Sequence, residues 1–147
     1  MPHQSLQGHP LVQAGRDYAV CVDQWFSGGA DALRSKEEEL QVHAHLGVGT
    51  VKEELIGLTK AVQTLRRYQR EIGLELISGL EQRAQDTDSS RAANGSVKAA
   101  LLAMDSSIAA WLKMKEFFPD KSDEILSLLL QLDRLRRETE SQFPRAR

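Results

Sequence analysis

The stretch that decides the fold is Val51–Ala84, which reads VKEELIGLTKAVQTLRRYQREIGLELISGLEQRA. Its apolar residues recur every three or four positions, and at about 100° per residue this spacing places them on one side of a helix. Thr50 and Glu53 have the spacing of a capping box, in which two side chains satisfy N–H groups that the first turn leaves unpaired. We therefore expect one long helix that faces the core. The residues on its inner stripe are Val51, Leu55, Leu58, Val62, Leu65, Ile72, Leu76 and Leu80.

Two helices are expected before this stretch. Gly47 can adopt the left-handed conformation that ends a helix, so the helix before it should end at Leu46. Further upstream, the strongest break is Ser27–Gly29. We therefore expect one helix over Leu11–Phe26 and a second helix between this break and Leu46.

The start of the second helix has two candidates. Ala30 directly follows the glycines, whereas Ser35 and Glu38 have the spacing of another capping box. The alternative is that the first two helices form one long bent helix through Gly28.

The C-terminal half contains two more expected helices. Residues 85–95, QDTDSSRAANG, are polar and end in an Asn-Gly turn signal, so we expect a loop there. Ser96 then caps a helix that Pro119 stops. The last helix opens with the acidic turn Ser122–Glu124, which suits the positive end of a helix dipole, and it ends near Glu140.

These elements predict a single all-α domain over residues 1–147, an antiparallel bundle of four or five helices with one long central helix. Residues 1–9 and 142–147 are expected to be tails. The composition agrees, because 41% of the residues are hydrophobic and 27% are charged, which is enough apolar material for an ordinary core. A single Cys excludes a disulfide within the chain.

The sequence carries no sign of export or of a membrane span. The N-terminus lacks the basic start and apolar run of a secretory signal. The densest apolar stretch, Ile125–Leu132, is much shorter than the roughly 20 residues that a span requires. A lone Cys is compatible with a reducing compartment. We therefore expect a soluble cytoplasmic protein, and its formal net charge of -2 provides no overall field that would attract nucleic acid.

The last expected helix has more apolar surface than one neighbour can cover. Its apolar side chains spread over roughly 220° of the helical wheel, against about 100° for an ordinary surface helix. Exposed apolar patches usually mark interaction sites, so we expect this face to bind a partner protein or a second copy of the chain. The alternative is that the bundle itself buries the face. The candidate partner-binding residues are Ile125, Leu126, Leu128, Leu129, Leu130, Leu132 and Leu135, with Ile56 and Leu74 from the outer side of the long helix.

No catalytic, cofactor or metal site is indicated. Glu39 and His43 share one helix face, but further metal ligands would have to come from another helix. Cys21 has no histidine near it in the sequence and is expected to act as a small apolar residue. The turn Gly47–Thr50 lacks the lysine and the glycine spacing of a P-loop. We therefore expect no enzyme, cofactor or metal, and the alternative is a set of groups that converge only in the folded chain.

Arg66, Arg67 and Arg70 form a local positive face on the long helix, which could contact an anionic partner. Glu71 and Glu75 dilute its field, and neither a recognition helix nor a base-stacking signature accompanies it. The sequence therefore predicts a non-catalytic helical protein–protein interaction module, such as an adaptor, a chaperone or a small subunit of a larger complex. The alternative is a nucleic-acid-associated regulator that uses the arginine-rich helix faces.

Overall fold

The computed structural model describes residues 6, 8–85, 90–144 and 146. Within these residues every regular element is a helix, so the predicted all-α bundle is confirmed. With α4 and α5 counted as one joined helix, the described part of the chain has five helices. The elements are α2 (Pro10–Gly28), α3 (Ala30–His45), α4 (Val51–Tyr68), α5 (Glu71–Gln85), α6 (Ser90–Phe117), the 3-10 turn η2 (Pro119–Lys121) and α7 (Ser122–Gln142).

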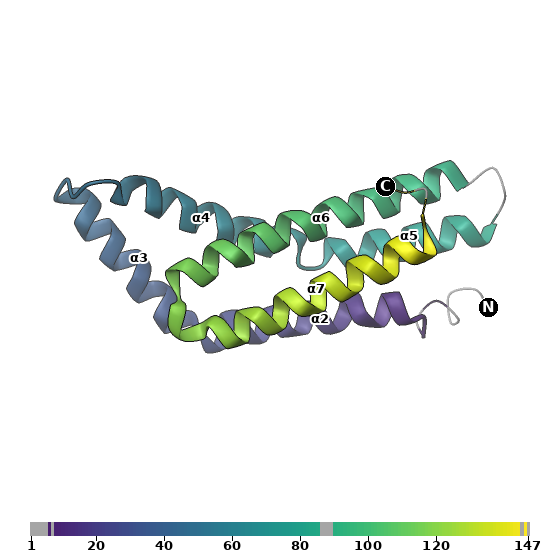
Figure 1. Ribbon diagram of the computed structural model, residues 1–147, viewed down its shortest axis with the longest axis horizontal. Helices are drawn as coiled ribbons and strands as arrows, with labels where there is room; N and C mark the ends of the chain where they lie inside the picture. The colour runs from purple at the N-terminus through teal and green to yellow at the C-terminus, as the bar shows by residue number, and fades with distance from the viewer. Residues whose placement is uncertain (1–5, 7, 86–89, 145, 147) are drawn as a thin grey trace.

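The helix at the centre of the packing is α6. It packs against α4, α5 and α7, and α2 lies against α7 and α5 on the other side of the bundle. Figure 1 shows α3 and the first half of α4 as a V-shaped arm at one end of the molecule, with α2 and α7 side by side below α6. None of the described helices is long and apolar enough to cross a membrane.

Aromatic side chains anchor the junction of α2 and α6. The rings of Trp25 and Trp111 meet edge to face with centroids 5.2 Å apart, Phe26 packs against both rings, and Phe118 packs against Trp25. The Trp111 indole N–H donates to the Tyr18 hydroxyl at 3.0 Å. Burial raises the pKa of Tyr18 to about 12, although this hydrogen bond acts in the opposite direction. The buried hydroxyl is therefore neutral and satisfied, as a core polar group must be.

The predicted long helix is present as two joined helices that meet at Gln69 and Arg70. Gln69 is buried, and its amide nitrogen donates to the Ala19 carbonyl oxygen at 3.0 Å and to Asp23 Oδ1 at 2.6 Å. The polar side chain at this joint is thus held by α2. The change of direction lets α5 follow α2 while α4 runs out into the arm (Figure 1).

Two glycines of the long segment lie where helices approach closely. A Cβ added to Gly79 would lie 2.6 Å from Val97 Cγ2, so α5 and α6 can meet here only without a side chain. A Cβ added to Gly15 of α2 would lie 3.2 Å from the Gly73 Cα, which marks the crossing of α2 and α5. Close packing therefore accounts for Gly73 and Gly79. At Gly57, by contrast, the only nearby atom is the flexible Cε of Lys113.

The predicted helix ends are partly confirmed. Gly47 has the left-handed conformation, with φ of 73°, and α3 ends just before it. Gly29 separates α2 from α3, so one bent helix through Gly28 is wrong. The second helix begins at Ala30, which places Ser35 inside it and rules out Ser35 as a cap. Thr50 is the N-cap of α4, but its side chain makes no capping hydrogen bond.

The expected loop over residues 85–95 is wrong for its second part. Ser90–Gly95 belong to α6, and Gln85 is the last residue of α5. Residues 86–89 lie outside the described residues. Ser96 is not a cap, because it lies within α6, six residues after the helix begins. Its hydroxyl donates to Gln82 Oε1 of α5 at 3.3 Å. The packing of α6 on α5 thus extends the helix through a segment whose local composition favours a turn.

Part of the expected C-terminal tail packs against the bundle, although Gln142 and Pro144 are exposed. Phe143 and Ala146 are buried, and the Arg83 guanidinium lies 4.1 Å from the centroid of the Phe143 ring. Arg83 Nη1 also donates to the Gln142 carbonyl oxygen at 3.0 Å, which ties the end of α7 to α5.

Candidate functional site

The seven apolar residues predicted on the last helix fall into two groups. Four of them belong to the core of the chain itself and are not available to a partner, which corrects the prediction for Ile125, Leu128, Leu132 and Leu135. The physical reason is that α7 packs against α2 on one side and α6 on the other, so two neighbours cover a wide apolar arc. Leu129 is partly buried against the core, whereas Leu126 and Leu130 are 46% and 60% exposed.

The two predicted residues outside α7 are both exposed, but they lie in different places. Leu74 lines a hollow between α2 and α5. Ile56 is on α4, near the end that enters the V-shaped arm (Figure 1). The structure therefore does not gather the predicted residues into one surface.

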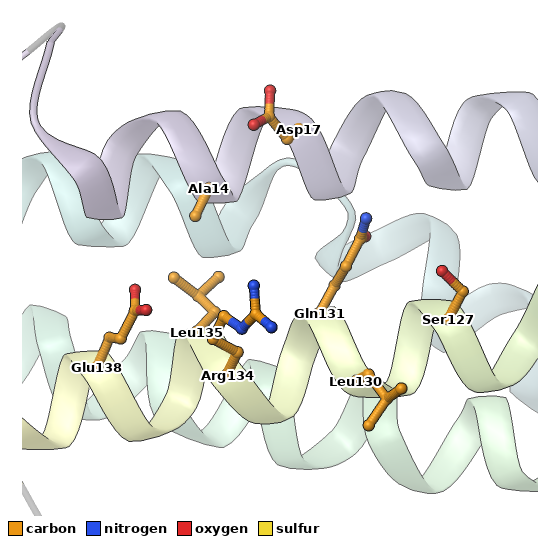
Figure 2. Close-up of a pocket in the computed structure, with 8 residues that line it drawn as sticks. All are labelled: Ala14, Asp17, Ser127, Leu130, Gln131, Arg134, Leu135 and Glu138. Carbon is orange, nitrogen blue, oxygen red and sulfur yellow. The ribbon is translucent and has the colours of Figure 1, made fainter.

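A groove lies between α2 and α7, and exposed residues of α7 line it together with residues of α2. It consists of two adjoining hollows of about 350 and 360 Å³, which share Ser127 and Gln131. Figure 2 shows the first of them, with Gln131 and Arg134 extending from α7 toward α2, while the Leu130 side chain points away from α2. We call this the α2–α7 groove. Its lining residues from α2 are Ala14, Asp17, Cys21, Gln24 and Trp25, and those from α7 are Glu124, Ser127, Leu128, Leu130, Gln131, Arg134, Leu135 and Glu138.

Helical spacing explains why this groove exists. Ala14, Asp17, Cys21 and Gln24 on α2 follow one another at intervals of three or four, and so do Glu124, Ser127, Gln131, Arg134 and Glu138 on α7. Each set is a single row along its helix, and the two rows face each other. Because the rows consist of small or polar side chains, they do not interlock as leucines would, and a groove remains above the core.

Hydrogen bonding within the groove is incomplete. The Gln131 amide nitrogen donates to Cys21 Sγ at 3.5 Å, while its buried Oε1 has no partner in the described part of the chain. The Trp25 indole nitrogen, which lies beside the same hollow, is buried and also lacks a partner. Buried polar atoms are normally satisfied, so two orphans at one seam are unusual.

The charges of the groove are predominantly acidic. Asp17, Glu124 and Glu138 lie along it, with Arg134 among them. Within the described residues neither Arg134 nor Glu138 forms an ion pair. The groove therefore presents one unpaired cation between carboxylates.

The predicted arginine face is largely engaged within the chain. Arg66 Nη1 lies 3.3 Å from Asp23 Oδ1, and its guanidinium lies 4.3 Å from the centroid of the Phe26 ring. Arg70 Nη2 is 4.0 Å from Asp23 Oδ2. The hydrogen bond from Gln69, together with the charges of Arg70 and Arg66, holds the pKa of Asp23 below its ordinary value. Arg67 lies over the Tyr68 ring at 5.1 Å.

Glu39 and Cys21, which the sequence analysis considered for metal binding and for reactivity, show no sign of either role in the described residues. Glu39 pairs with Lys36 at 3.2 Å, and the described residues contain no group of three His, Cys, Asp or Glu side chains that could hold a metal ion. The Cys21 thiol is half-buried, and its hydrogen-bonding neighbour is the Gln131 amide. The groove can thus supply apolar contacts, hydrogen bonds and charge to a bound molecule.

No family model, characterised protein or solved structure gives a significant match to the chain. Four residues that line the groove, Asp17, Gln131, Arg134 and Glu138, are not among the partner-binding residues expected from the sequence. The polar row from Glu124 to Glu138 at intervals of three and four was a usable signal, but its partner row on α2 lies about a hundred positions away and only the fold brings the two together.

Proposed function

We propose that the chain is a non-catalytic helical interaction module that binds a partner protein in the α2–α7 groove. The observation that supports this function is the coincidence, in one groove, of an exposed leucine, unpaired charges and unsatisfied buried polar atoms. Leu130 is 60% exposed at the edge of the groove, and Arg134 and Glu138 follow it along α7. An apolar anchor surrounded by a polar rim is the usual anatomy of a protein interface.

Leu130 is the expected centre of the binding energy. Fully burying a leucine contributes on the order of 2 kcal/mol, and Ala14 lines the same hollow as Leu130. Leu126, one turn earlier on α7, extends the exposed apolar surface. A partner that covers this stretch would remove both leucines from water.

The charge of the groove indicates the chemistry of the partner. Three carboxylates against one guanidinium favour a segment that carries lysine or arginine near its apolar anchor. A carboxylate or amide on the same partner segment could pair with Arg134. This pattern describes a basic amphipathic segment, and its charges would make association faster at low salt.

Within a cell, the module would serve as an adaptor, a chaperone or a small subunit of a larger complex, and we propose a cytoplasmic location. The alternative of a nucleic-acid-associated regulator receives less support, because Asp23 and Phe26 engage Arg66 and Asp23 faces Arg70. The Asp23 carboxylate thus offsets part of the positive charge that a polyanion would meet on this face.

The test is affinity capture with matched leucine variants. Leu130→Glu places a charge at the edge of the groove, whereas Leu102→Glu makes the same change on α6 at a residue that is 59% exposed. We expect a protein that the wild type and the Leu102→Glu variant enrich equally and that Leu130→Glu enriches at least about tenfold less, which corresponds to a loss of about 1.4 kcal/mol. Equal capture by all three forms would contradict the proposed site.

A further inference from the structure

A hollow of about 440 Å³ lies where α4 packs against α6, and it shares no residue with the α2–α7 groove. Five of its six lining residues belong to α4 and one belongs to α6. The α4 residues are spaced so that they occupy one face of that helix. We call this hollow the α4–α6 pocket. Its lining residues are Lys60, Gln63, Thr64, Arg67, Tyr68 and Ser106.

The lining of the α4–α6 pocket consists entirely of side chains that can donate a hydrogen bond, and none of them is a carboxylate. Lys60 and Arg67 add two positive charges. The two hollows of the α2–α7 groove and the hollow between α2 and α5, by contrast, each contain at least one carboxylate. The chemistry of the α4–α6 pocket therefore suits an anion.

The two cations of the pocket have no carboxylate partner within the described part of the chain. Lys60 forms no ion pair there. The Arg67 guanidinium lies over the ring of Tyr68, 5.1 Å from its centroid, and forms no ion pair with the described residues either. A ring contact leaves the N–H groups of a guanidinium available as donors. Both charges can therefore act on a bound molecule.

The neutral donors of the pocket are also unused within the described residues. Thr59 and Thr139 each donate to the carbonyl oxygen four residues earlier, as threonines in helices often do. The half-buried Thr64 has no such bond, and neither Gln63 nor Ser106 has a hydrogen bond among the described residues. Three neutral donors thus lie beside two free cations.

The acidic residues closest in sequence do not cancel this charge. Glu53 and Glu54 are in the first turn of α4, about 9–10 Å along the helix axis from Lys60. Asp105 precedes the α6 residue of the pocket, but its Oδ1 accepts a hydrogen bond from Arg136 Nη1 at 2.9 Å. The net charge of the pocket is therefore positive.

We propose that the α4–α6 pocket binds a small molecule that carries a diphosphate group. Phosphate oxygens accept several hydrogen bonds each and pair well with both lysine and arginine, so they match a lining made of donors. Lys60 and Arg67 are two helical turns apart, about 10 Å along α4, so one phosphoryl group pairs with each cation. The hydroxyls of Thr64 and Ser106 donate to the oxygens between them. This site is additional to the partner groove and lies on other helices.

The test is a titration of the full chain with pyrophosphate, followed by two-dimensional amide NMR at constant ionic strength so that general screening does not change. We expect the signals of Thr64 and Ser106 to shift with a dissociation constant of about 1 mM or lower. Lys60→Gln and Arg67→Gln should each weaken binding at least about fivefold, because each removes a charged donor. Thr64→Val keeps the size of the side chain and should weaken binding about two- to tenfold, as the loss of one neutral hydrogen bond does.

The matched controls are Arg91→Gln and Lys98→Gln, which remove the same charges from exposed positions of α6 outside the pocket and should bind as the wild type does. The absence of shifts up to about 20 mM pyrophosphate, equal weakening by the controls, or equal shifts with acetate would overturn the proposal. Tighter binding of a short DNA duplex that depends on Lys60 and Arg67 would overturn the small-molecule assignment. Far-UV circular dichroism checks folding, and if Thr64→Val unfolds, the two exposed cations decide. Loss of partner capture in the α2–α7 groove would not change any of these shifts, so the two proposals fail independently.

Discussion

At the scale of single residues, His9 holds the start of α2 in a pH-dependent way. Its Nδ1 accepts the N–H of Leu11 at 3.1 Å, which satisfies one of the amides that a first helical turn leaves open. Only neutral histidine has an acceptor nitrogen. Burial, and then the charge of Arg83, lowers the pKa of His9 below its ordinary value of 6.5. The charged form is therefore disfavoured in the folded chain.

This arrangement predicts that part of the stability is lost in mild acid. The contribution of the cap is complete above the unfolded pKa of 6.5, and it decreases as the pH falls from there through the lower folded pKa, because the unfolded chain binds the proton first. His9→Asn keeps a good N-cap that does not titrate. We expect the free energy of unfolding, measured in urea at about pH 7.5 and about pH 5, to fall less for this variant than for the wild type. Equal losses would show that His9 is not the titrating group.

At the scale of elements, two helical glycines differ in their surroundings: one is required by close helix packing and the other is not. Gly79 lies where α5 meets α6, and the atoms that a Cβ would touch include the Ala93 carbonyl oxygen at 3.2 Å as well as Val97. That oxygen is backbone and cannot move aside. Gly57 of α4 meets only the end of a lysine side chain, at 3.3 Å. Both residues weaken an isolated helix equally, so the difference between them comes from their neighbours.

The same substitution should therefore have opposite effects at these two glycines. We expect Gly57→Ala to stabilise the chain by about 0.5–1 kcal/mol through helix propensity alone. Gly79→Ala should destabilise it by about 1–3 kcal/mol, because overpacking outweighs that gain. Urea unfolding of both variants against the wild type measures the two effects. A stabilised Gly79→Ala variant would mean that α5 and α6 can separate at no cost.

At the scale of the whole molecule, the position of α7 decides what its leucines do. The helix packs against α2 and α6, and its inward-facing residues belong to the hydrophobic core of the bundle. Leu132 is fully buried, whereas Leu130 is 60% exposed only two residues earlier. The long apolar arc of α7 therefore divides into a structural part and a surface part.

This division predicts a sharp contrast between neighbouring leucines. Leu132→Ala should lower the free energy of unfolding by about 2–5 kcal/mol, since it removes buried methyl groups and leaves a cavity. Leu130→Ala should change it by no more than about 0.5 kcal/mol, as is usual for exposed positions. Thermal or urea unfolding of the two variants at the same low protein concentration makes the comparison. Similar values for the two variants would contradict this placement of α7.

The type of each element, and several of its ends, could be read from the sequence. Gly47 and Pro119 end helices through their own backbone properties, and the apolar stripes follow from helical spacing within one segment. The joint at Gln69 could not be read in this way, because its cause is Asp23 and the Ala19 carbonyl on another helix. Nor could the helical state of Ser90–Gly95, where packing on α5 overrides a local turn signal.

For the candidate groove, the sequence by itself determined that α7 would have surplus apolar surface and that Leu126 and Leu130 would lie on it. Only the tertiary structure decided that Leu128 and Leu132 are core residues, and that Gln131 meets Cys21 across 110 positions of the chain. The physical reason is the range of the interactions. Helix formation depends on residues three and four positions apart, whereas the burial of a side chain depends on which distant helix lies against it.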